Sequence, residues 1–317
     1  MSTFKEIRGT LIKSVSSDPA NPILGEMWYN STPGSQALKG MVSLTGQWAS
    51  GGNLGTARYG VQGGGTQNAA FVCGGYPPGT ATEKYDGTSW TGSGAMGTYR
   101  FTHAASGTET AGIAWAGYNP GVATATVNTE EYNGSSWSEQ NNIPTATSQN
   151  TGTGTQTATL AFAGSPFSGT LEYDGTNWTT SNNLNTPRYS SSRAGTQTAG
   201  LSAGGRNNSG DAYMANAEEY DGSTWTNVTA MPAAKGDFTG TGPQTAAVVF
   251  GGSPGSGATT LQYDGTNWTA VASMGQGRTF LASAGTGSSA LASGGRSTTA
   301  ATEEFTGGVI TKTFTTS

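Results

Sequence analysis

The feature of this sequence that most constrains its fold is a phrase that returns six times at nearly even spacing. In this phrase an aromatic residue is followed by a short polar turn and a tryptophan, as in Tyr85-Asp-Gly-Thr-Ser-Trp90. The aromatic position recurs at residues 85, 132, 173, 220, 263 and 305, so the intervals are 47, 41, 47, 43 and 42 residues. Periods in the forties are typical of four-stranded units that repeat around an axis.

A second phrase lies upstream of each aromatic residue and stays in register with it. It begins with Gly-Thr-Gln or a variant, continues through small and apolar residues, and ends in a glycine pair such as Gly74-Gly75 or in Ala-Gly. In the first repeat we expect one strand from Arg58, a second over 69–73, a third over 81–85 and a fourth from Ser89. The Asp-Gly between the last two predicts a hairpin, because both residues accept positive φ. The sequence therefore predicts an all-β protein that forms a six-bladed β-propeller.

The sixth copy is incomplete, because it reads Phe305-Thr-Gly-Gly and has no tryptophan hairpin. Propellers avoid exposed sheet edges by closing into a ring, and they do so by combining early and late strands in one blade. The missing outer strand is either residues 309–314 or the segment around Trp48. The sequence alone leaves both possibilities open.

The repeat resembles the kelch type of β-propeller. The shared elements are the double glycine after a hydrophobic strand, the tyrosine downstream and the tryptophan beyond it, as in Gly74-Gly75, Tyr85 and Trp90. The interval from tyrosine to tryptophan is shorter here, with four intervening residues where a kelch repeat usually has about six. The resemblance covers residues 55–317 and implies a kelch-like six-bladed propeller over this range.

The first 54 residues do not carry the repeat and are predicted to form a separate β-hairpin arm. The stretch Gly25-Glu-Met-Trp-Tyr-Asn-Ser-Thr32, followed by Leu38-Lys39 and Trp48, resembles a short module at the front of bacteriophage tail-fibre and other virion proteins. That resemblance implies attachment to other virion proteins through residues 1–54, with Trp28, Tyr29 and Trp48 as assembly residues. It also implies a homo-oligomer within a particle. A strand pair that simply caps the propeller is a compatible interpretation.

Composition excludes several classes of partner. The net charge is −5 and no basic run occurs, so we expect no nucleic-acid binding. No apolar stretch approaches the roughly 18 residues of a membrane span, and the N-terminus does not resemble a signal peptide. With the single cysteine Cys73, these features favour synthesis in a reducing cytoplasm. Residence in the virion, after synthesis in a host cell, is what the resemblance of the N-terminal module implies.

The residues needed for catalysis are scarce. His103 is the only histidine, so a metal centre or triad with two imidazoles is excluded, and we expect no cofactor. We interpret His103 and Cys73 as structural residues of inner strands. The pairs Glu130-Glu131, Glu218-Glu219 and Glu303-Glu304 recur at one blade position, which favours a scaffold role over a glycosidase pair. We therefore expect a protein that is not an enzyme.

The variable loops between the second and third strands are the predicted binding region, because recognition usually lies on loops held by a rigid scaffold. We expect the first-strand arginines to form structural contacts with the repeated glutamates. The predicted function is host-receptor or virion-protein binding by a tail fibre, spike or surface appendage. The alternatives are a cytoplasmic kelch-like adaptor and a glycan-binding or glycan-hydrolysing propeller. The candidate ligand-binding residues are Tyr76, Tyr118, Phe167, Arg206, Tyr213 and Arg296.

Overall fold

The computed structural model describes residues 13–17, 27–33, 37–166, 169–296 and 300–314. These residues form strands, turns and bends without a helix, so none of them belongs to a helix that could cross a membrane. The chain divides into two compact units, Gly46–Thr306 and Met1–Thr45 with Gly307–Ser317. The boundary predicted from the sequence lies between residues 54 and 55. The two units of the structure are divided between residues 45 and 46 and again between residues 306 and 307.

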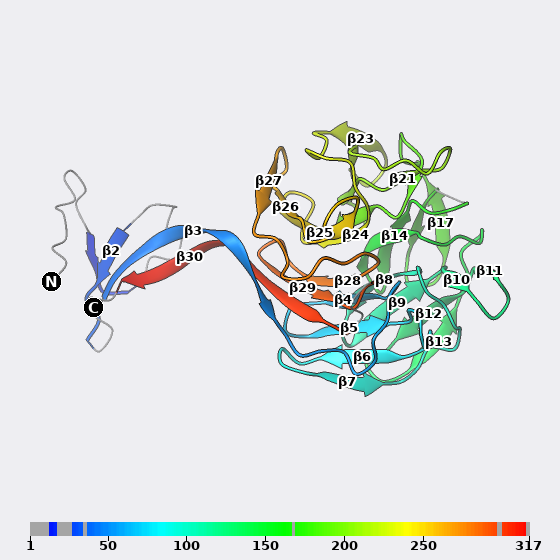
Figure 1. The fold of residues 1–317 in the computed structure, drawn as a ribbon, viewed down its shortest axis with the longest axis horizontal. Coiled ribbons are helices and arrows are strands. Elements are labelled where there is room, and N and C mark those ends of the chain that lie inside the picture. Colours follow the sequence, from blue (N-terminus) through cyan, green and yellow to red (C-terminus); the bar gives the residue numbers. More distant parts are fainter. Residues whose placement is uncertain (1–12, 18–26, 34–36, 167–168, 297–299, 315–317) are drawn as a thin grey trace. The chain divides into compact units, whose positions relative to one another are not determined.

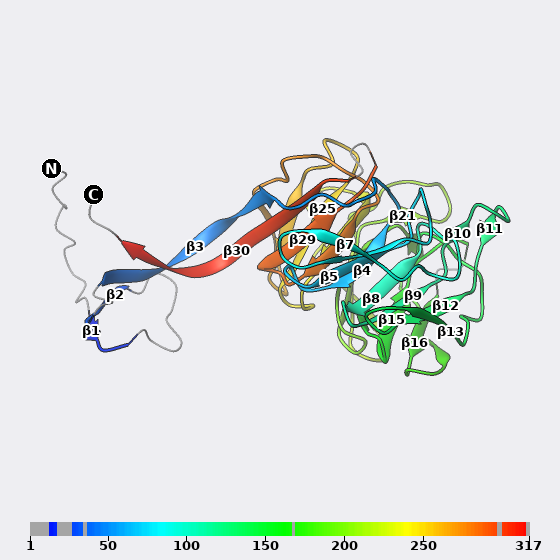
Figure 2. The ribbon, with the colours of Figure 1, turned by 90° about the horizontal axis from the view of Figure 1, so that it is seen from below.

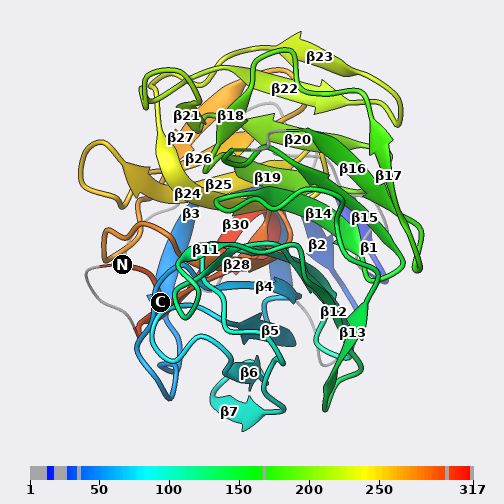
Figure 3. The ribbon, with the colours of Figure 1, turned by 90° about the vertical axis from the view of Figure 1, so that its right-hand side faces the viewer.

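The larger unit is a six-bladed β-propeller whose blades follow one another around the ring in chain order (Figure 1). Each blade is an antiparallel sheet that runs from an innermost strand near the axis to an outermost strand at the rim (Figure 3). The predicted fold class is therefore confirmed.

The first five blades, each given from its innermost to its outermost strand, are β4 (Gln62–Gly65), β5 (Ala70–Cys73), β6 (Thr82–Tyr85) and β7 (Trp90–Ser93); β8 (Ala104–Thr108), β9 (Ala111–Trp115), β12 (Thr129–Tyr132) and β13 (Trp137–Gln140); β14 (Thr151–Thr155), β15 (Ala158–Phe162), β16 (Thr170–Tyr173) and β17 (Trp178–Ser181); β19 (Ser192–Gly195), β20 (Gly200–Ala203), β22 (Ala217–Tyr220) and β23 (Trp225–Val228); and β24 (Gly236–Thr241), β25 (Ala247–Ser253), β26 (Thr260–Tyr263) and β27 (Trp268–Val271). The sixth blade consists of β28 (Ala282–Gly285), β29 (Ser289–Ser293), β30 (Thr302–Phe314) and β3 (Ala37–Ser50). Two short pairs lie in loops, β10 (Tyr118–Asn119) with β11 (Thr124–Ala125), and β18 (Arg188–Tyr189) with β21 (Arg206–Asn207).

The smaller unit contains the predicted hairpin. Strand β2 (Met27–Asn30) pairs with β3 in antiparallel fashion, and β1 (Lys13–Val15) adds to β2 in parallel. Strands β3 and β30 are long enough to contribute to both units, and they lie side by side along their length (Figures 1 and 2).

One residue in each blade carries the hydrogen bonds that close the ring. It is the second residue after the repeated arginine position, and in every blade its backbone is left-handed, with φ between 49° and 63°. Its N–H donates to the carbonyl oxygen of the equivalent residue in the preceding blade, over 2.7–3.0 Å. The N–H of Gly60 in the first blade donates to Phe280 in the sixth, so the circuit is closed. We call these residues the axial ring: Gly60, Thr102, Gln149, Ser190, Asp237 and Phe280.

The axial ring explains why the first strands begin later than the sequence predicts. The first strand was expected from Arg58, but β4 begins at Gln62. Between them Tyr59 makes an isolated bridge to Tyr76, and the left-handed Gly60 then redirects the chain. A left-handed conformation costs a non-glycine residue about 1 kcal/mol or more, so the hydrogen bonds between blades must hold Thr102 and its equivalents in it.

The ring closes through the N-terminal alternative, since β3 supplies the outermost strand of the sixth blade. The indole of Trp48 packs against Phe250 and Phe305 at centroid distances of 4.9 and 5.2 Å, and its Nε1 donates to Thr260 Oγ1 over 3.0 Å. The tryptophans of the first four blades make the same bond to a threonine hydroxyl of the preceding blade, as Trp137 does to Thr82, whereas Trp268 of the fifth donates to the backbone oxygen of Thr229. Residues 309–314 instead continue β30 beyond the propeller unit.

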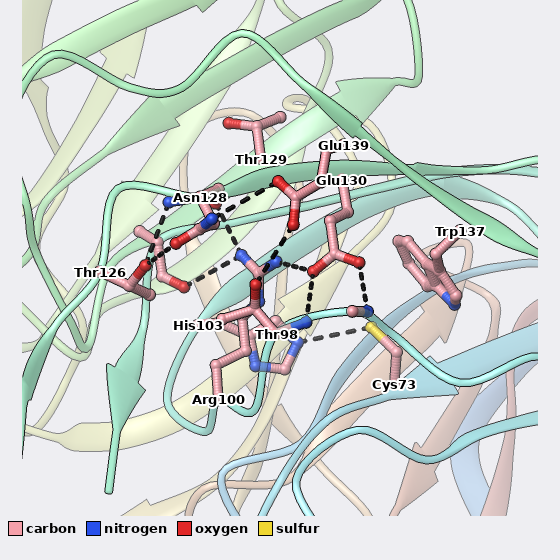
Figure 4. Close-up of polar contacts among 12 residues, drawn as sticks. Cys73, Thr98, Arg100, His103, Thr126, Asn128, Thr129, Glu130, Trp137 and Glu139 are labelled. Atoms are coloured by element: carbon pink, nitrogen blue, oxygen red, sulfur yellow. Dashed lines mark hydrogen bonds and ion pairs between the residues drawn. The ribbon is translucent and has the colours of Figure 1, made fainter. Parts of the chain in front are cut away.

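Four first-strand arginines are completely buried and paired, as the sequence predicts: Arg58, Arg100, Arg188 and Arg278. Arg188 donates from Nη2 to Glu218 Oε1 over 2.5 Å and from Nη1 to two backbone carbonyl oxygens of its own blade. Figure 4 shows the corresponding arrangement of Arg100 and Glu130. Burial lowers the pKa of Arg188, and the charge of Glu218 acts against this shift.

The third and fifth blades lack both members of this ion pair. In the third blade Thr147 and Leu171 stand at the arginine and glutamate positions, and in the fifth blade Lys235 and Leu261 do. In the third blade the joint loss fits the cost of a buried charge that has no partner. In the fifth blade the buried Lys235 keeps a cation, and its Nζ donates to the backbone oxygen of Pro254 over 3.2 Å.

We expect Arg188→Thr to lower the free energy of unfolding by about 3 kcal/mol or more, because it leaves the Glu218 carboxylate buried and unpaired. The double variant Arg188→Thr with Glu218→Leu copies the third blade and should cost less than either single change. Denaturant unfolding monitored by tryptophan fluorescence measures all three values. Equal or additive losses in the single and double variants would contradict this account.

Trp48→Ala should destabilise the propeller by about 3 kcal/mol, because it removes the aromatic wedge that completes the sixth blade. Tyr29→Ala in the same N-terminal segment is the matched control, since Tyr29 is 39% exposed. The thermal midpoint should fall clearly for the first variant and stay nearly unchanged for the second. A Trp48 variant as stable as the parent would show that β3 is not needed for closure.

Candidate functional site

One face of the propeller gathers the residues in which the blades differ most. In each blade, the residue after the arginine position pairs with the residue after the glycine pair, which brings the start of the first strand beside the loop between the second and third strands. We call the face formed by these pairs the loop face. The pairs are Tyr59 with Tyr76, Phe101 with Tyr118, Ser148 with Ser165, Tyr189 with Arg206, Gly236 with Ser253 and Thr279 with Arg296.

An aromatic row crosses the first two blades on this face. The ring of Tyr59 lies 5.9 Å from Tyr76 and 6.0 Å from Phe101, and Phe101 lies 5.5 Å from Tyr118. Tyr76 is 42% exposed, which is high for so large a side chain. The guanidinium of Arg296 lies over the Tyr59 ring, 5.1 Å from its centroid, and so extends the row into the sixth blade.

The structure therefore brings together three of the predicted residues, Tyr76, Tyr118 and Arg296. Tyr59 and Phe101 were not predicted as site residues, although each directly follows a repeated arginine. The feature of the sequence that could have identified them is that the residue type at this position changes from one repeat to the next.

Two other predicted residues, Arg206 and Tyr213, form a separate cluster. Arg206 donates to Asp237 Oδ2 over 2.6 Å and to Asp211 Oδ1 over 3.0 Å, and it stacks on Tyr213 at 4.4 Å. The hydroxyl of Tyr189 donates to the same Asp211 carboxylate. Burial disfavours the charge of Arg206, but the two aspartates outweigh burial and raise its pKa. Arg206 is thus neutralised within the protein.

Two open cavities of about 500 and 380 Å³ lie on the loop face. The larger is bordered by the Arg206 cluster and the smaller by the aromatic row, and they share Gln149, Phe280 and Arg296. Arg296 is exposed and, among the residues that the structure describes, has no carboxylate partner. Phe167, the remaining candidate, lies outside the described residues.

The assembly candidates fall in different places. Trp28 and Tyr29 are neighbours in β2, where Trp28 is buried and Tyr29 is exposed. Trp48 belongs to the propeller itself, where it completes the sixth blade.

The glutamate pairs hold neighbouring blades together. The first member pairs with the buried arginine of its own blade, and the second accepts a hydrogen bond from the tyrosine of the next blade. In the fourth blade these contacts are Glu218 with Arg188, and Glu219 with Tyr263 over 2.9 Å. The scaffold thus already uses the carboxylates that a glycosidase would need.

Arg193 lies across the propeller axis and was not anticipated from the sequence. It donates to Gly63 O over 2.8 Å, to Gly152 O over 3.0 Å and to Ala105 O, which belong to the innermost strands of three other blades. Its burial lowers its pKa to about 10. The feature of the sequence that could have identified Arg193 is its large side chain, because the other repeats have Gly, Ala or Ser at this position.

His103 and Cys73 face each other inside the propeller, with Nε2 and Sγ 3.4 Å apart (Figure 4). Both side chains are fully buried. Burial raises the pKa of the Cys73 thiol to about 12, and burial followed by the charge of Arg100 lowers the pKa of His103 well below its usual value. In the described part of the chain, no group of three His, Cys, Asp or Glu residues is placed to hold a metal ion.

Neither a protein-family model nor a curated protein matches the sequence. The class that the fold defines is a six-bladed β-propeller with an asymmetric loop face.

His103 makes stability depend on pH in a defined direction. Its folded-state pKa lies below the unfolded value of about 6.5, so the unfolded chain binds more protons once the pH falls below that value. We expect the free energy of unfolding to fall between neutral pH and pH 5 through this group, by at most about 2 kcal/mol. His103→Gln should remove that part of the slope in denaturant unfolding across pH 7 to 5. An unchanged slope would mean that His103 can accept its proton in the folded state.

Proposed function

We propose that this protein is a structural and recognition component of a bacteriophage particle, as a tail fibre, spike or surface appendage. In this proposal the kelch-like propeller binds a host-surface glycan or protein, or a neighbouring virion protein, through its loop face. Residues 1–54 attach the chain to other virion proteins within an oligomer. The protein acts by binding and catalyses no reaction.

The observation that carries the proposal is the division between repeated and unrepeated residues. The repeated residues bind one another within and between blades, arginine to glutamate, tyrosine to glutamate and tryptophan to threonine. The residues that break the repeat, such as Tyr76, Tyr118 and Arg296, gather on the loop face beside open cavities. Exposed aromatic and arginine side chains are enriched where proteins recognise partners.

The assignment to a virion is supported by the resemblance of residues 25–48 to modules of tail-fibre proteins. If the chain is a virion component, mass spectrometry of purified particles detects it in stoichiometric amount. Its absence from particles, together with capture of a cytoplasmic partner, would instead support the adaptor alternative.

Adsorption of particles to host cells tests the recognition role. We expect Tyr76→Ala combined with Tyr118→Ala to reduce adsorption at least about tenfold, since the changes remove the exposed ring of Tyr76 and the half-buried ring of Tyr118 from the aromatic row. Val122→Ala is the control, because Val122 is 67% exposed and lies outside the aromatic row. Undiminished adsorption of the double variant would remove the loop face as the recognition surface.

A further inference from the structure

We propose that the loop face binds an acidic saccharide, with Arg296 holding a carboxylate of the ligand and the aromatic row contacting its sugar rings. This inference rests on the proposed function and names the class of ligand for the same face.

The first argument compares Arg296 with Arg206, which occupies the equivalent position two blades earlier. Each arginine follows a glycine pair and lies beside the next blade. For Arg206 the next blade supplies Asp237 at the axial ring, and the two form an ion pair of 2.6 Å. For Arg296 the next blade supplies Gly60 at the axial ring, which has no carboxylate. The two arginines thus occupy equivalent places in the fold, but only Arg206 has a carboxylate of the next blade beside it.

The second argument concerns the orientation of the Arg296 side chain. Its guanidinium lies 5.1 Å from the centroid of Tyr59 and 5.9 Å from that of Phe280. Stacking on aromatic rings restrains a guanidinium while leaving its edge free to donate two parallel hydrogen bonds, the arrangement that suits a carboxylate. The other described arginines are already paired with carboxylates or backbone carbonyl oxygens.

The third argument concerns the surroundings of Arg296, which suit a sugar better than a peptide. The exposed ring of Tyr76 and the half-buried rings of Tyr59 and Tyr118 offer flat apolar surfaces with a polar edge. Such surfaces match the C–H face and the hydroxyls of a pyranose. Gln149, Ser148 and Thr279 add amide and hydroxyl groups around the two cavities. A peptide strand would need an unpaired backbone edge, but the loop-face residues bridge each other, as Tyr59 does Tyr76.

Net charge limits how the saccharide is held. The chain carries −5 overall, so a polyanion is not attracted to the protein as a whole. Binding must depend on a local contact, and one ion pair gives only a shallow dependence on salt. This distinguishes the proposed site from a polybasic surface.

The test uses the full chain and four acidic polymers: polygalacturonate, alginate, hyaluronate and colominic acid. Each is compared with its carboxyl-reduced counterpart, which keeps the sugar backbone and removes the charge. By isothermal titration calorimetry we expect at least one acidic polymer to bind, and its reduced form to bind at least about tenfold more weakly. Arg296→Gln should cause a similar loss, and Tyr76→Ala should weaken binding of the acidic and reduced forms alike. Lys84→Gln, which removes a cation from the outer hairpin, should leave affinity unchanged; thermal midpoints confirm that all variants fold.

Several results would overturn the inference. They are no binding of any of the four polysaccharides, equal binding of the acidic and reduced forms, or an unaffected Arg296→Gln variant. Polyglutamate is titrated as an acidic polymer without sugar rings, and stronger binding of it than of all four polysaccharides would also overturn the inference. The proposed function is judged separately, by particle composition and adsorption. If the tyrosine variants lose adsorption while no acidic polymer binds, recognition by the loop face stands and the acidic saccharide falls. If an acidic polymer binds as expected but particles lack the chain, the acidic-saccharide site stands and the assignment to a virion falls.

Discussion

The structure depends on a closed circuit of backbone hydrogen bonds around the propeller axis. Each blade contributes one left-handed residue that donates to its counterpart in the preceding blade, from Gly60 through to Phe280 and back. Because five of these six residues are not glycine, the conformation persists only while neighbouring blades are in place. In each blade the residue before this left-handed residue pairs with the residue after the glycine pair. One local feature therefore closes the ring and creates the loop face.

In the remaining scaffold contacts, the two partners of a contact change together from one blade to another. The buried arginine and glutamate are present together in four blades and absent together in two. Where the second repeat has Glu109 in place of the turn glutamine, the preceding blade supplies Lys84 as its partner over 2.8 Å. In the sixth blade Phe305 and Trp48 replace the hairpin that other blades build from adjacent residues. Each departure from the repeat is matched by a second change beside it.

The residues that build the scaffold thus differ from the residues of the loop face, which we assign to recognition. The repeated carboxylates are committed to arginine or tyrosine, so they add little free charge to the loop face. There the asymmetry is strong: one side is aromatic, and the other is occupied by the Arg206 cluster, in which two aspartates balance the arginine and leave one negative charge over. Arg296 lies between them as an exposed cation, and the axial-ring residue beside it is a glycine where Arg206 has Asp237. An exposed cation held by aromatic rings on a rigid scaffold is well suited to bind an anionic group.

The sequence by itself determined the number of blades, the order of strands within a blade and the structural role of the first-strand arginines, because these follow from local patterns repeated six times. It also placed Tyr76, Tyr118 and Arg296 on one face. It did not determine the closing strand, the axial ring, the position of Arg193 across the axis, or the participation of Tyr59 and Phe101. Those depend on contacts between residues far apart in the chain, such as Trp48 with Thr260 and Gly60 with Phe280. Only tertiary structure decides them, because packing between blades selects the partners of a side chain, whereas a repeat specifies each blade alone.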